Sequence, residues 1–315
     1  MRYRPLGQSG LLVSVVGLGC NNFGGRLDAD RTRSVVDAAI DVGITLFDTS
    51  DTYGGGGGSE RALGEILGSR RDQVVLATKF GGRGVDMGYG PAAGAKGGRA
   101  YIRRAVDGSL QRLRTDYIDL YQLHVPDLAT PVEETLAALS ELVAEGKVRY
   151  IGHSNFSGWQ LADAAHLAAR HGHTPFISAQ NHWSLLDRDV ERELVPAAEH
   201  YGVGVLPYFP LGQGLLTGKV RRGEPIPEGT RLAGRAHLVT ERRLDQVEAL
   251  RTLADKLGRS LLELAVAGLA ARPVVGSVIA GASRPEQVRA NVAAGTWTPT
   301  PEELALIDEI TADDS

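Results

Sequence analysis

The chain has 315 residues, of which 43% are hydrophobic, enough for one large core or two small ones. Its net charge of −4, with both signs interspersed, gives no basic stripe for nucleic acid, and no apolar run reaches the length of a membrane span. The single cysteine, Cys20, excludes an internal disulfide and favours a cytoplasmic location, and the first residues lack the apolar segment of a signal peptide.

The first predicted element is a β-hairpin over about residues 3–13, with its turn at residues 7–10. Eight short apolar runs rich in β-branched residues then recur, separated by about 25 to 35 residues except before the last. They cover residues 13–19, 45–47, 74–79, 117–124, 148–154, 176–180, 203–208 and 274–280. This rhythm predicts parallel strands, each followed by a helix.

Helical patterns fill the gaps between these runs, and capping residues mark where several helices start. The expected start signals are Asp28 or Asp30, Ser59, Thr130, Ser157 and Thr300. Two further helical patterns, near residues 240–257 and 260–271, occupy the long gap before the last strand.

Eight strand–helix units without a break in composition favour one (β/α)8 TIM barrel domain over residues 1–315. The barrel would carry an N-terminal β-hairpin and extra C-terminal helices, and an open doubly wound sheet is the alternative. Two long loops, residues 81–98 and 220–237, are rich in glycine or charge and are predicted to be flexible lids or binding loops.

Titratable side chains stand where three of the predicted strands end. Asp48 ends the second strand, and Tyr53 follows it beside five glycines, residues 54–58. We expect these glycines to be slack, that is, a loosely constrained part of the loop beside Tyr53. Lys79 ends the third strand and His124 the fourth. Because all strand ends of a barrel open on one face, the four side chains are expected to meet there.

These four residue types suit proton transfer to a carbonyl oxygen. Asp48 would hold Lys79, which would lower the pKa of Tyr53 and let it donate a proton as the general acid. His124 would donate a hydrogen bond to the carbonyl oxygen. No serine elbow or metal cluster is visible to attack the carbonyl carbon, and a nicotinamide hydride fits that need. Taken singly, Lys79 also suits a structural ion pair and His124 a core histidine.

The chain resembles the aldo-keto reductase family over nearly its whole length, in particular the bacterial branch related to potassium-channel β subunits. Asp48, Tyr53, Lys79 and His124 match the catalytic tetrad of that family in residue type, order and strand position. The resemblance implies a barrel, NADPH as cofactor, and reversible reduction of aldehydes or ketones.

The resemblance also implies a cofactor site. The Ser-Asn pair after the fifth strand would bind the nicotinamide carboxamide, Tyr208 would stack on its ring, and the loop after Tyr208 would cover the pyrophosphate. Residues 281–287 resemble the site for the 2′-phosphate and adenine, where a helix N-terminus and Arg284 favour an anion. The implied contacts are Gly19, Cys20, Asn21, Asp48, Ser154, Asn155, Gln180, Tyr208, Phe209, Pro210, Leu211, Gln213, Lys219, Gly281, Ser283, Arg284, Gln287 and Asn291.

The substrate is expected to be a small carbonyl compound, with Phe23, Trp183 and residues 81–98 as its wall. NADH is possible as the cofactor. Two other functions stay open on the same scaffold: an NAD-dependent sugar or alcohol dehydrogenase, and a nucleotide-sensing regulatory subunit with little turnover. The oligomeric state is open as well.

Overall fold

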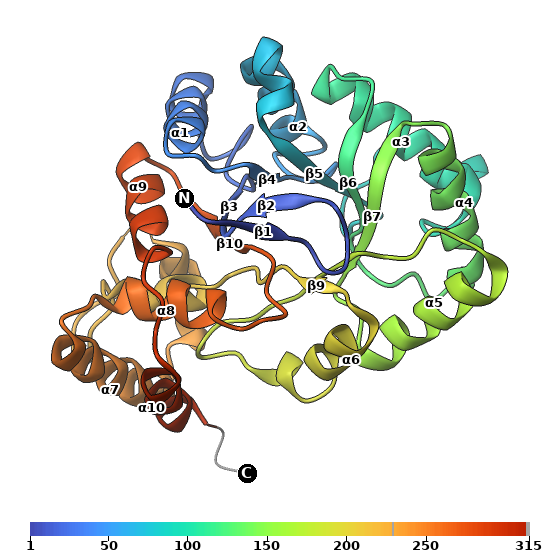
Figure 1. Ribbon diagram of the computed structural model, residues 1–315. Helices are drawn as coiled ribbons and strands as arrows, with labels where there is room; N and C mark the ends of the chain where they lie inside the picture. Colours follow the sequence, from blue (N-terminus) through green and yellow to red (C-terminus); the bar gives the residue numbers. More distant parts are fainter. Residues whose placement is uncertain (229, 313–315) are drawn as a thin grey trace.

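The computed structural model describes residues 1–228 and 230–312, and its parallel strands close into a barrel surrounded by helices (Figure 1). The strands are β3 (Val16–Gly19), β4 (Leu46–Asp48), β5 (Val75–Phe80), β6 (Ile118–Leu123), β7 (Val148–Ser154), β8 (Ser178–Gln180), β9 (Gly204–Val205) and β10 (Val278–Gly281). They pair in chain order, with β10 beside β3. Parallel bridges from Val205 to Val275 and from Tyr208 to Ile279 join the two ends of the sheet. The predicted (β/α)8 barrel is confirmed.

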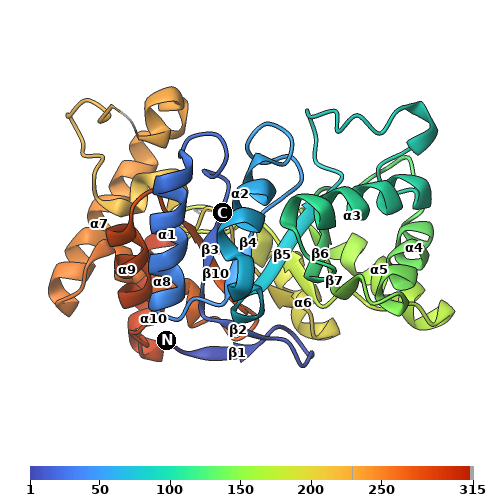
Figure 2. The same ribbon diagram turned by 90° about the horizontal axis from the view of Figure 1, so that it is seen from above.

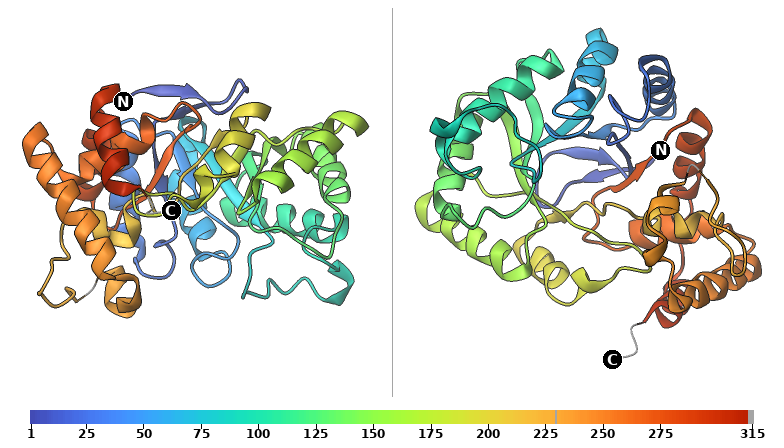
Figure 3. Two further views of the ribbon diagram at one scale, coloured as in Figure 1. Left: turned by 90° about the horizontal axis from the view of Figure 1, so that it is seen from below. Right: turned by 180° about the vertical axis from the view of Figure 1, so that it is seen from behind.

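Ten α-helices are assigned within the described residues. They are α1 (Ala29–Asp41), α2 (Gly58–Leu67), α3 (Arg99–Leu113), α4 (Val132–Ala144), α5 (Gly158–His171), α6 (Leu194–Tyr201), α7 (Glu241–Leu257), α8 (Leu261–Ala270), α9 (Pro285–Ala294) and α10 (Pro301–Thr311). The last helix packs against α7 and α8 on one side of the barrel (Figure 3). These are the extra C-terminal helices that the sequence predicts.

Helix starts follow the capping signals at three of the expected positions. Asp28 caps α1 by accepting a hydrogen bond from a backbone N–H in the first turn. Ser157 and Thr300 form capping boxes at the starts of α5 and α10. Each side-chain oxygen satisfies a backbone N–H that the helix itself leaves without a partner.

At two other expected positions, Ser59 and Thr130, a helix starts within two residues of the signal, but the hydroxyl group does not cap it because it is engaged elsewhere. Helix α2 is preceded by Gly57, and the Ser59 hydroxyl instead donates to the carbonyl of Cys20 at 2.8 Å. The Thr130 hydroxyl donates to Asp127 at 2.9 Å, and α4 starts without a side-chain cap. A hydroxyl group that could cap a helix can instead donate to another acceptor, which is distant in sequence for Ser59 and three residues away for Thr130.

The predicted hairpin forms from β1 (Tyr3–Pro5) and β2 (Leu12–Ser14) and closes one end of the barrel (Figure 2). Its buried side chains Leu6, Leu11 and Val13 form one apolar cluster with strand residues such as Leu46 and Leu120. This cluster fills the barrel end where the strands begin. The long loops at the opposite end, including residues 81–98, surround the ends of the strands (Figure 2).

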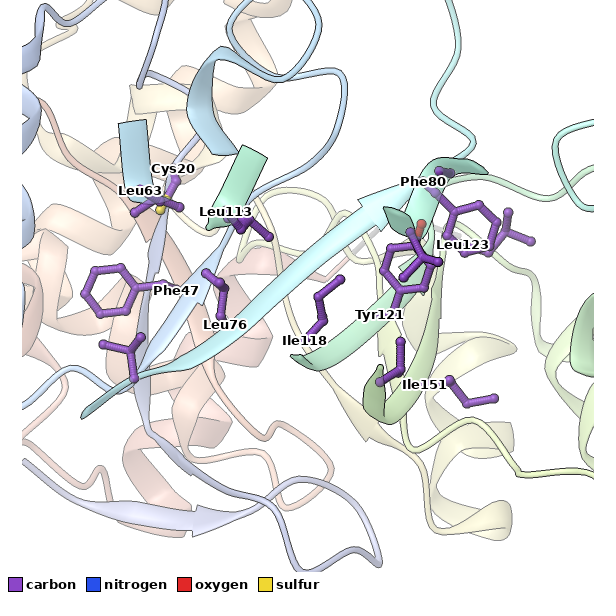
Figure 4. Close-up of a cluster of buried hydrophobic side chains, with 14 of the residues drawn as sticks. Cys20, Phe47, Leu63, Leu76, Phe80, Leu113, Ile118, Tyr121, Leu123 and Ile151 are labelled. Carbon is purple, nitrogen blue, oxygen red and sulfur yellow. The ribbon is translucent and has the colours of Figure 1, made fainter. Parts of the chain in front are cut away.

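A second apolar cluster packs the outer face of the sheet against α2 and α3 (Figure 4). Along β5, Leu76 and Phe80 belong to this outer cluster, whereas Ala77 belongs to the inner one. Because side chains alternate along a strand, Lys79 faces the barrel interior and Thr78 faces the helices. The alternation therefore decides which polar residues of β5 reach the site.

The two long loops contain short 3-10 turns, at Pro91–Ala93 in the first and at Arg231–Gly234 and Ala236–Leu238 in the second. Their flexibility stays a prediction, as does the assignment of residues 1–315 to one domain.

Candidate active site

Four titratable side chains meet where β4, β5 and β6 end. Asp48 is the last residue of β4, Tyr53 lies in the following turn, Lys79 lies in β5, and His124 directly follows β6. The backbone N–H of His124 donates to the carbonyl of Phe80 at 2.8 Å, which continues the pairing of β5 and β6 beyond the last strand residue. The parallel register thus brings together residues that are up to 76 positions apart.

Lys79 is fully buried and forms the centre of this group. Its ammonium donates to both carboxylate oxygens of Asp48, at 2.7 and 2.8 Å, and to the carbonyl of Thr49 at 2.9 Å. It also lies 3.5 Å from Tyr53 Oη. Gln180 Nε2 donates to Asp48 Oδ1 at 2.9 Å from the other side. A buried ion pair persists only when such extra hydrogen bonds surround it.

The electrostatic balance keeps Lys79 charged and Tyr53 protonated. Burial opposes the Lys79 charge, but Asp48 and Tyr53 together outweigh it and raise the pKa of the ammonium. Burial also raises the pKa of Tyr53, and the nearby Lys79 ammonium offsets only part of that effect. The expected lowering of the Tyr53 pKa is therefore wrong in its net direction, because desolvation of the phenol outweighs the cation.

His124 stands beside Tyr53, with the two rings edge to face and their centroids 5.8 Å apart. Burial lowers the pKa of His124 to about 3, and the ammonium groups of Lys79 and Lys96 act in the same direction. The imidazole is therefore neutral at physiological pH and has one N–H to donate. Its Nδ1 lies 3.1 Å from Ser50 Oγ, so Nε2 is the nitrogen left for another partner.

Side chains at the end of β7 and after β9 continue the polar wall. Asn155 Nδ2 donates to the carbonyl of His124 and to Ser154 Oγ, both at 3.0 Å. Ser154 Oγ donates to the carbonyl of Gln180 at 2.7 Å, and Tyr208 Oη donates to Asn155 Oδ1 at 2.8 Å. Asn155 adopts a left-handed backbone conformation, with φ of 61°, which asparagine tolerates better than most residues. These bonds fix the Ser-Asn pair next to the tetrad.

A cavity of about 1040 Å³ runs from this group to the start of α9. Its lining contains Asp48, Tyr53 and His124, while Lys79 lies behind it. Every residue that the resemblance implies as a cofactor contact lines the same cavity: Gly19, Cys20, Asn21, Asp48, Ser154, Asn155, Gln180, Tyr208, Phe209, Pro210, Leu211, Gln213, Lys219, Gly281, Ser283, Arg284, Gln287 and Asn291.

The chemistry of this lining fits a nicotinamide dinucleotide. Amide side chains of Asn155 and Gln180 lie near Tyr53, and Lys219 and Arg284 add cations to the wall. Arg284 occupies the N-cap position of α9, where its charge and the positive end of the helix dipole favour a phosphate. A long cavity with amides at one end and a helix N-terminus at the other matches the two ends of such a cofactor.

The predicted substrate wall differs from the observed cavity. Phe23 and Trp183 are 0% and 2% exposed and pack inside apolar clusters instead of lining it. No residue of 81–98 lines it either. The cavity also contains residues that the sequence did not single out, including Arg26 and Glu228. The signal for them was weak, because both lie in loops whose course depends on tertiary packing.

The described residues contain no cluster of three His, Cys, Asp or Glu side chains that could bind a metal ion. None of the helices in this part of the chain is long and apolar enough to cross a membrane.

Comparison with known proteins agrees with this geometry. Residues 15–312 match the model of the Aldo/keto reductase family. The chain is 39% identical to "Uncharacterized oxidoreductase YrpG" of Bacillus subtilis (strain 168), over 98% of this chain and 96% of that protein. It is 36% identical to "L-glyceraldehyde 3-phosphate reductase" of Escherichia coli (strain K12), over 99% of this chain and 93% of the relative. It is also 36% identical to "Probable voltage-gated potassium channel subunit beta" of Oryza sativa subsp. japonica, over 99% of this chain and 96% of that protein. The resemblance seen in the sequence is confirmed, and the chain belongs to the aldo/keto reductase family.

Proposed function

We propose that this chain reduces an aldehyde or ketone to the alcohol with NADPH, and that Tyr53 is the general acid. Membership of the family makes the protein an oxidoreductase that works with a nicotinamide cofactor. The observation that carries the proposal is the 3.5 Å contact between Tyr53 Oη and the buried ammonium of Lys79, at the wall of the large cavity.

Each residue of the tetrad has a distinct task. A bound nicotinamide supplies the hydride. Tyr53 retains its proton at neutral pH, since burial raises its pKa, and gives it to the carbonyl oxygen. Lys79 stabilises the phenolate that Tyr53 leaves, and Asp48 fixes Lys79 through two hydrogen bonds. Neutral His124 donates an N–H to the same oxygen as negative charge develops on it.

The test is the Tyr53→Phe variant, which removes only the phenolic hydroxyl. A general acid contributes about 10²- to 10⁴-fold, so kcat should fall by about 10³-fold while the Kd for NADPH stays unchanged. Tyr3→Phe removes a hydroxyl from an exposed tyrosine of the hairpin and serves as the control. Turnover by Tyr53→Phe at the parent rate would exclude Tyr53 as the acid.

The preference for NADPH rests on the cationic start of α9. Arg284 lines the cavity there, and Ser283 is close by, with its backbone N–H and hydroxyl bonded to Gln287 Oε1. Arg284→Ala should weaken NADPH binding about tenfold and NADH binding little, because only NADPH has the 2′-phosphate. Arg289→Ala, an exposed arginine on the same helix, is the matched control. Equal losses for both cofactors would contradict this preference.

A screen of carbonyl compounds, followed by NADPH absorbance, would identify the substrate. The relative named L-glyceraldehyde 3-phosphate reductase makes that aldehyde the first compound to test. An NAD-dependent sugar or alcohol dehydrogenase would instead oxidise alcohols with NAD, with equal affinity for both cofactors. A regulatory subunit would oxidise one cofactor per chain in a burst without steady turnover. We also propose a cytoplasmic location, which the single buried, free thiol of Cys20 supports.

A further inference from the structure

A second buried polar cluster lies behind the active site, between the outer face of the sheet and helices α2 and α3. Glu60 is fully buried and accepts hydrogen bonds from Thr78 Oγ1 and from Arg112 Nε, each at 2.6 Å. Asp51 is equally buried, and its Oδ1 accepts from the Ser50 hydroxyl at 3.2 Å. Its Oδ2 has no hydrogen-bond partner among the described residues. The cluster thus places two carboxylates close together, and only Glu60 binds the guanidinium directly.

Ser50 connects this cluster to His124. Its Oγ lies 3.1 Å from His124 Nδ1 and accepts from the backbone N–H of Thr52 at 3.2 Å. A hydroxyl has one proton and two lone pairs, and the Thr52 N–H occupies one lone pair. Ser50 therefore has one donor and one acceptor position left for Asp51 and His124, so it accepts from one and donates to the other. The Thr52 hydroxyl, 3.1 Å from Ser50 Oγ, competes for the same two positions, so this link between Asp51 and His124 requires the Thr52 hydroxyl to turn away from Ser50.

We propose that Asp51 is a positioning residue that determines, through Ser50, which ring nitrogen of His124 carries the proton. When Asp51 is ionised, Ser50 donates to the carboxylate and accepts from Nδ1–H, and Nε2 is left with a lone pair. When Asp51 is protonated, its O–H donates to Ser50, Ser50 donates to Nδ1, and the imidazole proton resides on Nε2. The imidazole is neutral in both states, and the net change is one proton taken up by Asp51.

Only the state with protonated Asp51 offers an N–H to a carbonyl oxygen. Nδ1 is engaged by Ser50 in both states, so a substrate can meet only Nε2. This catalytic consequence rests on the proposed function, in which His124 donates to the carbonyl oxygen. The tautomer change itself does not, because it involves only Asp51, Ser50 and His124.

The surroundings of Asp51 bring its titration into the neutral range. Burial raises the pKa of Asp51 to about 7, with a further contribution from the negative charge of Glu60. The Ser50 hydrogen bond and the charges of Arg112 and Lys96 act in the opposite direction.

Three tyrosines are the other titratable neighbours of Asp51: Tyr89 in the long loop, Tyr101 on α3 and Tyr121 on β6. Their phenols stay protonated at neutral pH, because burial raises the pKa of each.

The sign of the pH effect follows from these values. His124 stays neutral throughout, because burial, together with Lys79 and Lys96, lowers its pKa to about 3. Below about pH 7 Asp51 is protonated and His124 carries Nε2–H, and at higher pH it carries Nδ1–H. The kcat/KM for reduction should then be about 30-fold lower at pH 8.5 than at pH 5.5.

The experiment is a pH series of imidazole ¹H–¹⁵N spectra of the full chain, with neither cofactor nor substrate added. The His124 signals should change from the Nε2–H to the Nδ1–H pattern with a midpoint near pH 7. Asp51→Asn should abolish the pH dependence, because an amide does not titrate. Ser50→Ala should abolish it as well, because the link is cut while Asp51 remains. Asp116→Asn, an exposed carboxylate in the turn before β6, should leave the change intact.

A His124 tautomer that stays constant from pH 5.5 to 8.5 in the parent chain would overturn the proposal, and this reading does not depend on the variants folding. If the tautomer change of His124 persisted in Ser50→Ala, the proposal would be overturned too. Asp51 would then act on His124 only through the electrostatic field of its charge. The kcat/KM profiles provide the second measurement, in which Asp51→Asn should lose the step near pH 7. If the spectra changed as expected while Tyr53→Phe turned over normally, the tautomer inference would stand and the proposed function would fail.

Discussion

His153 of β7 is a buried histidine with no hydrogen-bond partner among the described residues for either ring nitrogen. Its ring stacks on Phe156, with centroids 4.3 Å apart, and meets Phe176 edge to face at 5.3 Å. Burial alone lowers the pKa of His153 to about 3. The folded chain can therefore accept this proton only at a pH far below the value at which the unfolded chain accepts it.

This difference makes the stability of the fold depend on pH. Histidine in an unfolded chain has a pKa of about 6.5, so the unfolded state takes up the proton as the pH falls through that value. The free energy of unfolding should drop by about 2 kcal/mol between pH 8 and pH 5, and by about 4 to 5 kcal/mol near pH 3. The contribution of the neutral ring is thus complete above about pH 6.5 and is lost on acidification towards the folded pKa.

The variant His153→Leu removes the titratable ring and fills a similar volume with apolar atoms. Urea unfolding of both proteins, followed by tryptophan fluorescence and circular dichroism, gives the difference in free energy at each pH. The variant should gain about 2 kcal/mol relative to the parent on going from pH 8 to pH 5. The exposed His200→Gln is the control and should show no such gain. If the difference between His153→Leu and the parent were the same at both pH values, the reasoning would be refuted.

Two further predictions concern buried charges. Lys79→Met leaves the Asp48 carboxylate buried without a cation and should lower the free energy of unfolding by about 3 to 5 kcal/mol. Asp48→Asn in the same chain should restore much of that loss in urea unfolding, and an additive double variant would contradict the pairing. Asp119 accepts from Arg71 at 2.7 Å, from Arg149 at 2.8 Å and from a backbone N–H of β5 at 2.9 Å. Asp119→Asn should cost about 1 to 3 kcal/mol, and an unchanged thermal midpoint would show that these bonds contribute no net stability.

The sequence was sufficient for the barrel and for the positions of the tetrad, for a physical reason. Apolar runs at regular intervals allow few topologies, and a barrel places every strand end on one face. Tyr53, Lys79 and His124 could therefore be brought together without any knowledge of their contacts. The alternation along β5, which sends Lys79 inward, follows from the same pattern.

Other features were not predictable, because they depend on tertiary surroundings. Burial sets the net direction of the Tyr53 pKa, and no local pattern reports it. Phe23 and Trp183 are aromatic near strand ends, yet both point into apolar clusters. The contact of Ser50 with His124 joins two loops 74 positions apart. In the sequence around Ser50, the one feature that pointed towards this contact was a second acid, Asp51, three positions after Asp48.

The glycine run after Tyr53, expected to be slack, is sterically restricted at both ends and open in its middle. Residues 54–57 all have φ between 68° and 89°, a conformation that L side chains rarely adopt. A Cβ at Gly54 would lie 2.7 Å from the carbonyl oxygen of Phe23, and one at Gly58 would lie 2.8 Å from that of Gly24, whereas a Cβ at Gly55 would meet nothing within 4 Å. A saturation library of this segment should therefore be graded, with Gly54 and Gly58 intolerant and Gly55 accepting asparagine. The backbone conformation, more than side-chain chemistry, therefore restricts which residue types are tolerated next to the proposed proton donor, Tyr53.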